Sequence, residues 1–269
     1  MITPTLNAGT TLRRTLQSAA SLQQQGIELE HYIIDGGSTD STIKYAEKFC
    51  ADNHWCQLLK RPGLKLYESM NLGLTKAQGH FSHILNADDF IIKPGSYARH
   101  LCLGIEKSSS ILIMGVVIFQ LNNGKIIRRW NAEDPSTKGI TWREACKKGF
   151  HVAHPGFLAL TSLYRQTAFS TIYPDSADYK MMQTLLLNPK LQNMIETTPE
   201  LIIAMASGGI TSRPDSILRG MGQLKAINKE LGIKENLLKR YYRKLIELMS
   251  CQIRVSFLEL PSDSPRQEQ

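Results

Sequence analysis

The first 90 residues alternate between short apolar runs and amphipathic stretches, and this alternation limits the possible folds more than any other feature. Residues 2–6, 31–34 and 81–85 have the length and composition of β-strands. Between the first two runs, four apolar side chains recur at helical spacing: Leu12, Leu16, Ala19 and Leu22. Strands that alternate with helices favour right-handed crossovers. The pattern therefore predicts an α/β fold with a central, mostly parallel sheet flanked by helices.

The chain divides into one large domain and a basic C-terminal part. Its 269 residues, 42% of them hydrophobic, suit one α/β domain at residues 1–215. Residues 216–269 are expected to form a helical extension with a frayed polar tail. From residue 213 to 257 there are ten Lys or Arg against four Asp or Glu, and apolar residues recur at helical spacing after 235. Such a helix either packs on the domain with a solvated positive face or docks on anionic lipid.

Composition also sets expectations about location. No run of about 18 apolar residues is present, and residues 10–25 are too polar for a secretory signal. Five cysteines without a Cys-x-x-Cys spacing indicate buried, reduced thiols rather than a metal or redox site. We therefore expect a cytoplasmic protein, with peripheral contact at the inner face of the membrane as a further option. No recognisable module suggests nucleic-acid binding, despite a net charge of +8.

Polar turns follow the predicted strands directly, at residues 3–7, 35–40 and 88–89. Ligands of an open parallel sheet bind beyond the carboxyl ends of the strands. Asp35 could accept a hydrogen bond from a base or ribose there, although glycine-rich turns also serve merely as connections. The adjacent carboxylates of Asp88 and Asp89 repel each other unless solvent or a cation separates them. A divalent ion with phosphate oxygens and a solvated acidic turn both remain open for this pair.

Seven short motifs occur in order along the chain, and three of them contain these polar turns. They are ITPTLN at 2–7, IIDGGSTD at 33–40, YESMNLG at 67–73, LNADD at 85–89, HPGF at 154–157, ADY at 177–179 and GGIT at 208–211. Together they resemble the family-2 glycosyltransferases with the GT-A fold, notably bacterial enzymes of capsule and exopolysaccharide assembly of the colanic-acid type. The resemblance covers about residues 1–225.

The resemblance implies a nucleotide and metal site. The residues expected to hold the nucleotide base are Thr3, Pro4, Thr5, Asp35 and Ser38. Asp88 and Asp89 match the acidic motif of the family. By this match Asp88 lies near the ribose, and Asp89 binds Mg²⁺ or Mn²⁺.

The resemblance also implies a donor and acceptor side. Asp178 matches the general base of inverting members, although from its position alone it could simply cap a helix. His154 lies in the acceptor-side loop, where a bond to backbone is the other interpretation. Lys65, Glu68 and Asn71 match a segment that closes over the donor. Glu68 stands where aspartate is more usual, which leaves the donor sugar open.

These expectations define a metal-dependent, inverting glycosyltransferase. It would transfer a hexose or N-acetylhexosamine from a nucleotide diphosphate sugar, with UDP as the favoured carrier. The acceptor would be a saccharide or a lipid-linked molecule in surface polysaccharide synthesis. Two alternatives remain: a sugar nucleotidyltransferase, and a catalytically silent nucleotide-binding or assembly protein on the same fold. The nucleotidyltransferase is disfavoured because residues 7–13 make a poor triphosphate loop.

Overall fold

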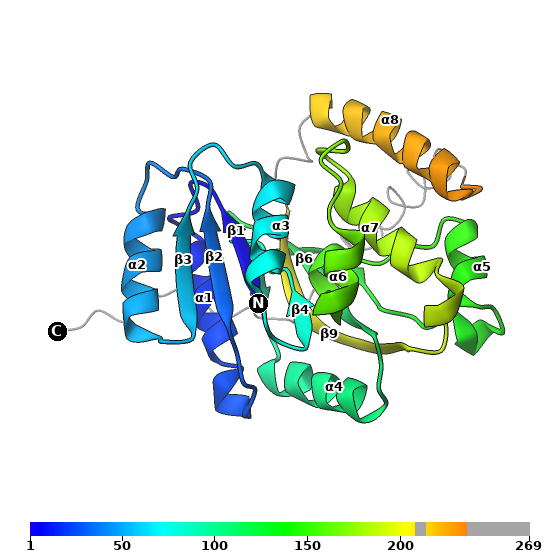
Figure 1. The fold of residues 1–269 in the computed structure, drawn as a ribbon, viewed down its shortest axis with the longest axis horizontal. Helices are drawn as coiled ribbons and strands as arrows, with labels where there is room; N and C mark the ends of the chain where they lie inside the picture. Colours follow the sequence, from blue (N-terminus) through cyan, green and yellow to red (C-terminus); the bar gives the residue numbers. More distant parts are fainter. Residues whose placement is uncertain (208–213, 236–269) are drawn as a thin grey trace.

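The computed structural model describes residues 1–207 and 214–235, and its N-terminal part is a small parallel sheet (Figure 1). Three strands pair in the order β1-β2-β3, all parallel. They are β1 (Ile2–Thr5), β2 (His31–Asp35) and β3 (Cys56–Lys60). The connecting helices are α1 (Leu12–Ala20), α2 (Thr42–Asp52) and α3 (Leu66–Lys76), with a short 3₁₀ turn η1 (Gln23–Gln25) after α1. The predicted strand–helix alternation is confirmed in this region.

Alternation along β2 decides which helices cover which face of this sheet. Ile33 packs in one cluster with Leu12 of α1 and Ala46 of α2. Its neighbour Ile34 points to the opposite face, where it shares a cluster with Met70 of α3. Successive side chains of a strand face opposite sides, so an apolar run in a strand requires helices on both faces.

The second sheet has six strands and is mixed, so the prediction of one mostly parallel sheet is wrong here. Five strands follow the order β4-β8-β6-β9-β5, and β7 pairs with β6. The strands are β4 (Phe81–His83), β5 (Phe90–Ile91), β6 (Ile111–Gln120), β7 (Ile126–Trp130), β8 (Phe157–Leu160) and β9 (Ile195–Ser207). Within this sheet of the described chain, only β6 and β9 run parallel. A parallel bridge between Ile2 and Ile84 joins the two sheets.

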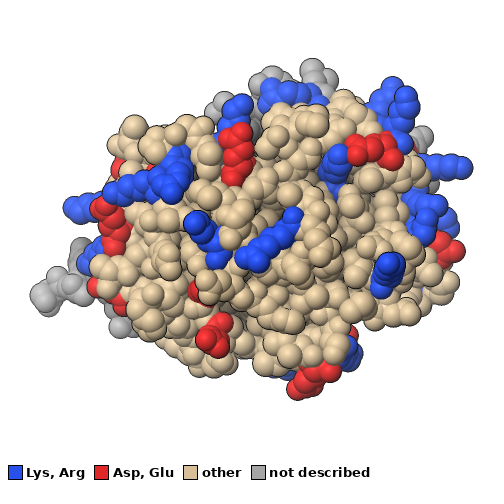
Figure 2. All heavy atoms as spheres, viewed as in Figure 1, with Lys and Arg blue, Asp and Glu red and all other residues tan. Residues whose placement is uncertain are grey.

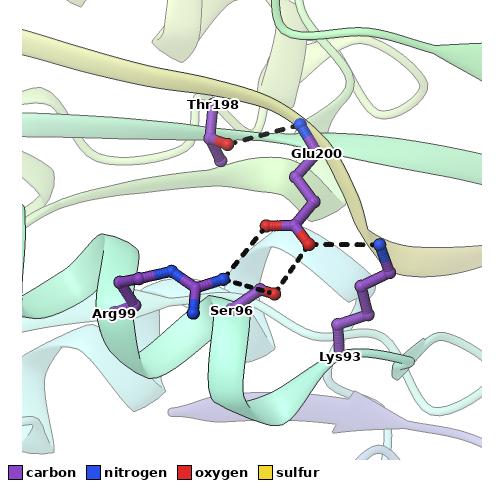
Figure 3. Close-up of polar contacts among 5 residues, drawn as sticks. All are labelled: Lys93, Ser96, Arg99, Thr198 and Glu200. Atoms are coloured by element: carbon purple, nitrogen blue, oxygen red, sulfur yellow. Dashed lines mark hydrogen bonds and ion pairs between the residues drawn. The ribbon is translucent and has the colours of Figure 1, made fainter.

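The helix α4 (Pro94–Glu106) is tied to β9 at a bulge (Figure 3). The carboxylate of Glu200 accepts hydrogen bonds from Ser96 Oγ at 2.8 Å and Lys93 Nζ at 3.1 Å, and pairs with Arg99 at 3.4 Å. A Cβ at Gly115 would lie 2.7 Å from the Glu200 backbone oxygen, so the bulge requires glycine on the neighbouring strand.

The remaining helices of the described chain all follow β7 in sequence. They are α5 (Trp142–Lys147), α6 (Thr161–Thr167), α7 (Ala177–Leu186) and α8 (Pro214–Leu231), with 3₁₀ turns η2 (Pro135–Lys138), η3 (His154–Gly156) and η4 (Pro189–Leu191). Leu224 and Ile227 of α8 form a buried cluster with Tyr179 of α7, and Figure 1 shows α8 lying along the α7 side of the molecule. The expected domain boundary at 215 falls at the start of α8. The GGIT motif at 208–211 and the basic helix expected after 235 lie outside the described residues.

Three expectations from composition concern membrane-spanning helices, surface charge and cysteines. In residues 1–207 and 214–235, no helix combines the length and apolar character needed to cross a membrane. Lys and Arg on the face shown in Figure 2 lie in several separate groups, interspersed with Asp and Glu. The described cysteines are free thiols, with Cys56 and Cys146 buried, Cys50 half-buried and Cys102 exposed. Burial, which the sequence predicted for the cysteines, holds for only two of these four, and Cys50 Sγ lies 2.8 Å from Cys56 Sγ.

Candidate active site

Two loops at the carboxyl ends of β1 and β2 are joined by hydrogen bonds between backbone and side chains. The backbone N–H of Asn7 donates to Ser38 Oγ at 2.8 Å, and that of Gly9 donates to Asp40 Oδ2 at 2.9 Å. In return, the backbone N–H of Thr39 donates to Asn7 Oδ1 at 2.9 Å. Residues 6–9 and 36–41, here called the paired loops, therefore form one unit at the sheet edge where ligands of such sheets bind.

Asp35 and Thr3 are used within the fold rather than left open to a ligand. Asp35 is 1% exposed, and its carboxylate accepts the backbone N–H groups of Ser38 at 2.9 Å and Gly37 at 3.2 Å. Thr3 is fully buried; its hydroxyl donates to Leu85 O at 2.8 Å and also lies 2.8 Å from His31 Nε2. Asp35 thus braces its own loop, and Thr3 joins β1 to the end of β4.

The other residues predicted to hold the nucleotide base divide in the same way. Pro4 and Thr5 are buried in β1, whereas Ser38 lies in the paired loops. The groups of this region that are open to solvent therefore lie in the paired loops around Ser38.

The two carboxylates of the acidic turn have different environments. Asp89 is 1% exposed, and its Oδ1 accepts the Ala206 backbone N–H at 3.0 Å. Its Oδ2 accepts Asn86 Nδ2 at 3.1 Å. Asp88 is only half-buried. Burial, followed by the charge of Asp88, raises the pKa of Asp89 well above its ordinary value, and the Arg14 guanidinium opposes this.

The environment of the acidic turn favours a nearby cation. Burial also raises the pKa of Asp88, so both carboxyl groups would be stabilised as anions by a nearby positive charge. Each Asp89 oxygen accepts one hydrogen bond from the protein, and a carboxylate oxygen has a second lone pair for a metal ion, so metal binding by Asp89 stays a prediction. Within the described residues, no three His, Cys, Asp or Glu side chains are grouped closely enough to hold a metal ion. Asp88 is the more exposed of the two carboxylates, and both stay candidate ligands.

Asp178 lies in the first turn of α7 and is bound by a tyrosine from a distant helix. The Tyr67 hydroxyl of α3 donates to Asp178 Oδ1 at 2.9 Å, and Asp178 is half-buried. Burial, followed by the Asp178 carboxylate, raises the pKa of Tyr67 well above its ordinary value, so the hydroxyl remains a donor. The N-cap position of α7 is Ser176, with no side-chain cap bond. The carboxylate thus has a long-range partner, which the helix-cap interpretation did not anticipate.

Two further predicted residues gather around the same tyrosine through Phe169. The rings of Tyr67 and Phe169 stack with centroids 5.6 Å apart, and His154 meets Phe169 edge-on at 5.7 Å. Asn71 holds the Phe169 backbone by two hydrogen bonds, each 2.8 Å long. Asn71 and His154 therefore lie in one cluster with Asp178, Tyr67 and Phe169, here called the base cluster.

The Nε2 of His154 does not make the bond to backbone that the sequence analysis considered. The side chain is 7% exposed, and its Nε2 is buried without a hydrogen-bond partner in the part of the chain that the structure describes. Burial lowers the pKa of His154, and the charge of Asp178 opposes the effect.

Lys65 and Glu68, predicted to contact the donor, lie at the start of α3. Glu68 Oε2 accepts the Lys65 backbone N–H at 2.9 Å, which satisfies an N-terminal amide of the helix. The Lys65 side chain is exposed. Sequence reasoning did not single out Tyr67, Phe169 or Arg14. A signal for Tyr67 existed, because it opens the YESMNLG motif next to Glu68.

The match to known proteins agrees with this geometry. Residues 1–172 match the model of the family described as Glycosyl transferase family 2. The chain belongs to this family. The family match argues against the sugar nucleotidyltransferase alternative.

Relatives of this glycosyltransferase include the PGL/p-HBAD biosynthesis glycosyltransferase Rv2957 of Mycobacterium tuberculosis, 28% identical over 183 residues. That match covers 68% of this chain and 64% of the relative, so the chain aligns with less than two thirds of the relative's length. Chondroitin synthase of Pasteurella multocida is 29% identical over 100 residues, which are 37% of this chain and 10% of that protein. These relatives support the family but do not single out the capsule or colanic-acid type.

Solved structures support the GT-A type of fold. Staphylococcus aureus TarS 1–349 in complex with UDP-GlcNAc superposes with a TM-score of 0.61 at 18% identity, over 95% of this glycosyltransferase and 72% of that chain. Glucosyl-3-phosphoglycerate synthase of Mycobacterium tuberculosis, in complex with Mn²⁺, UDP and its product, gives 0.53 at 15% identity over 86% and 79% of the two chains.

Proposed function

We propose that this glycosyltransferase transfers a hexose or N-acetylhexosamine from UDP to an acceptor hydroxyl, with inversion at the anomeric carbon. The observation that carries the proposal is the half-buried Asp178 carboxylate, which a tyrosine hydroxyl from another part of the chain holds at 2.9 Å. A fixed carboxylate that is partly open to solvent suits a general base, because it must reach a substrate proton without moving.

The nucleotide binds at the paired loops. The bonds between Asn7, Ser38, Gly9 and Asp40 fix these loops before any ligand arrives, which limits the ordering cost of binding. UDP is the favoured carrier because similar solved structures are complexes with UDP, UDP-GlcNAc and UDP-glucose. One similar mannosyltransferase, from Pyrobaculum calidifontis, is in complex with GDP-Man and Mn²⁺, so the test below includes GDP-mannose.

A divalent cation, Mn²⁺ or Mg²⁺, belongs at the acidic turn. Asp88 would hold it directly, with diphosphate oxygens and water as the other ligands. Asp89 would support the metal site indirectly, because its hydrogen bonds to Ala206 and Asn86 fix the conformation of the turn. When bound, the cation would neutralise the charge that develops on the diphosphate leaving group.

Asp178 takes the proton of the acceptor hydroxyl. Tyr67 occupies Oδ1, which leaves the other carboxylate oxygen for the acceptor. As the acceptor oxygen bonds to the anomeric carbon, the bond from that carbon to the diphosphate oxygen breaks and its electron pair leaves with UDP. The proton moves to Asp178. Attack opposite the leaving group gives a β-linkage from an α-linked donor.

A role in surface polysaccharide or glycolipid synthesis follows from the names of the relatives. They comprise a PGL/p-HBAD biosynthesis glycosyltransferase, a chondroitin synthase and a hyaluronan synthase. The acceptor is accordingly a saccharide or a lipid-linked molecule, and the chain is expected at the cytoplasmic side of the membrane.

The test is a donor screen with analysis of the product. Purified protein with Mn²⁺ is mixed with UDP-glucose, UDP-galactose and UDP-N-acetylglucosamine, GDP-mannose and a panel of saccharide and lipid-linked acceptors. Nucleotide diphosphate release and the anomeric proton coupling of the product are measured by NMR. We expect metal-dependent release of UDP and a β-linked product. An α-linked product would eliminate Asp178 as the base of a single inverting step.

A further inference from the structure

The segment that carries Asp178 is fastened to α8 by its neighbours in sequence. Three residues before Asp178, the Asp175 carboxylate pairs with Arg219 through both oxygens; Nη2 lies 2.9 Å from Oδ1, and Nε binds Oδ2. Gln223, one turn further along α8, donates to Asp175 Oδ2 at 2.9 Å and accepts the Asp175 backbone N–H at 3.0 Å. Asp175 is thus bound to α8 by both side chain and backbone.

The residues after Asp178 make a second set of bonds to the same helix. Tyr179 donates its hydroxyl to Asn228 Oδ1 at 2.8 Å, and Lys180 Nζ lies 2.7 Å from Glu230 Oε1. Residues 175, 179 and 180 therefore attach to α8, whereas Asp178 between them points to Tyr67 of α3. The segment that carries Asp178 is therefore bound to both α3 and α8, two helices that are distant in sequence.

We propose that α8 is a positioning element for the catalytic base, and that Arg219 sets the place of Asp178 by holding Asp175. This inference rests on the proposed function, because it assigns α8 a role in the chemistry of that site. Arg219 contacts neither donor nor acceptor in this proposal; it acts through the segment 175–178.

The division between polar and apolar contacts makes the proposal testable. Leu224 and Ile227 are buried against Tyr179, so apolar packing attaches α8 to α7 independently of Arg219. The Arg219 side chain is 51% exposed, so it adds little to the apolar packing that holds α8. The Asp175 side chain is 4% exposed, so its bonds define one geometry for the loop. Removal of Arg219 should leave the fold intact and release the loop.

The experiment compares Arg219→Gln with a matched control. Lys107 forms an ion pair with Glu196 at 2.8 Å, is 53% exposed, and lies at the end of α4, away from the base cluster. We expect Arg219→Gln to lower kcat about 10-fold, since a base displaced by a fraction of an ångström loses alignment with its substrate. KM for the UDP-sugar and the melting temperature should stay close to wild type. Lys107→Gln should change none of these, and Arg219→Lys should restore part of kcat.

A second measurement does not depend on turnover. Amide hydrogen exchange over residues 173–180 should become faster in Arg219→Gln and stay unchanged in Lys107→Gln. If Arg219→Gln loses its cooperative melt, Gln223→Ala removes two hydrogen bonds to Asp175, leaves the ion pair with Arg219 in place, and serves instead.

The outcomes separate this inference from the proposed function. An unchanged kcat in Arg219→Gln, or parallel losses of kcat, UDP affinity and melting temperature, would overturn the positioning role. A wild-type protein that transfers no sugar from any donor would overturn the proposed function instead. The exchange experiment would still report whether Arg219 orders the loop.

Discussion

The paired loops and the base cluster are built by different kinds of contact. The paired loops are closed by hydrogen bonds between two turns, each of which directly follows a strand of the parallel sheet. The base cluster draws Tyr67 from α3, Phe169 from the segment after α6 and Asp178 from α7, residues more than 100 positions apart in the extreme. One site is local in sequence, and the other exists only after the chain has folded.

The two regions should therefore differ in how well they tolerate substitutions. The paired loops need only their own turn residues and the adjacent strand ends. The base cluster depends on the packing of α3, α6, α7 and α8 together. A small shift of any of these helices should therefore change the position of Asp178. We therefore expect substitutions at the nucleotide side to affect binding, and those at the base side to affect turnover.

Asp178→Asn should give the largest effect. An amide cannot take the acceptor proton, so kcat should fall by about 10²–10⁴-fold. The amide keeps an oxygen that can accept the Tyr67 hydroxyl, so the fold and nucleotide affinity should hold. Initial rates under saturating donor measure the loss. Retention of more than about a tenth of the wild-type kcat would remove Asp178 from the proton transfer.

Asp88→Ala and Asp89→Ala should separate binding from stability at the acidic turn. Asp89→Ala leaves the buried Ala206 N–H without its acceptor, which should lower the free energy of unfolding by about 1–3 kcal/mol in urea titrations. Asp88→Ala should change the free energy of unfolding little. It should reduce the stimulation of kcat by Mn²⁺ at least about 10-fold. If Asp89→Ala instead lost the Mn²⁺ dependence and Asp88→Ala lost stability, Asp89 would be the metal ligand.

Tyr67→Phe should lower kcat about 5- to 10-fold with little change in donor KM. Phenylalanine keeps the stack on Phe169 and removes only the hydroxyl that donates to Asp178. Tyr164→Phe is the matched control, because that hydroxyl donates to the Phe157 backbone, 3.2 Å away. Equal kcat losses in the two variants would mean that the effect is general to buried tyrosines.

Acid should destabilise the support of the base cluster through His83. Burial lowers the pKa of His83 to about 3, and its Nε2 lies 2.8 Å from the oxygen of Pro155, which follows His154. Because the folded-state pKa is depressed below about 6.5, the unfolded chain gains a proton first as the pH falls. His83 should therefore cost about 0.8 kcal/mol of stability between pH 7.5 and 6. Urea titrations of His83→Gln should show a weaker pH dependence by that amount; an identical dependence would contradict this.

The sequence allowed the local site to be predicted better than the long-range one. The turns at 35–40 and 88–89 were expected at strand ends because period and composition mark short strands and their exits. The partners of Asp178 were not predicted, because nothing local links residue 67 to residue 178. The distinct environments of Asp88 and Asp89 also escaped prediction, since they depend on the backbone N–H of Ala206.

The fold shows the same limit. The hairpin of β6 and β7 has a local signal, because a turn of Asn and Gly lies between two β-rich runs. The apolar run at 157–163 continues past Leu160, where β8 ends and α6 begins. The antiparallel pairings of β4 with β8 and β5 with β9 join segments up to about 120 residues apart. Local periodicity does not encode such pairings, which is why a mostly parallel sheet was predicted.

The division of labour between the two regions is tested most directly by calorimetric titration of UDP with Mn²⁺ into wild type, Asp88→Ala and Asp178→Asn. We predict that Asp178→Asn binds UDP as tightly as wild type, whereas Asp88→Ala loses the metal-dependent part of the affinity. Loss of UDP binding in Asp178→Asn together with normal metal-dependent binding in Asp88→Ala would contradict the assignment of both sites.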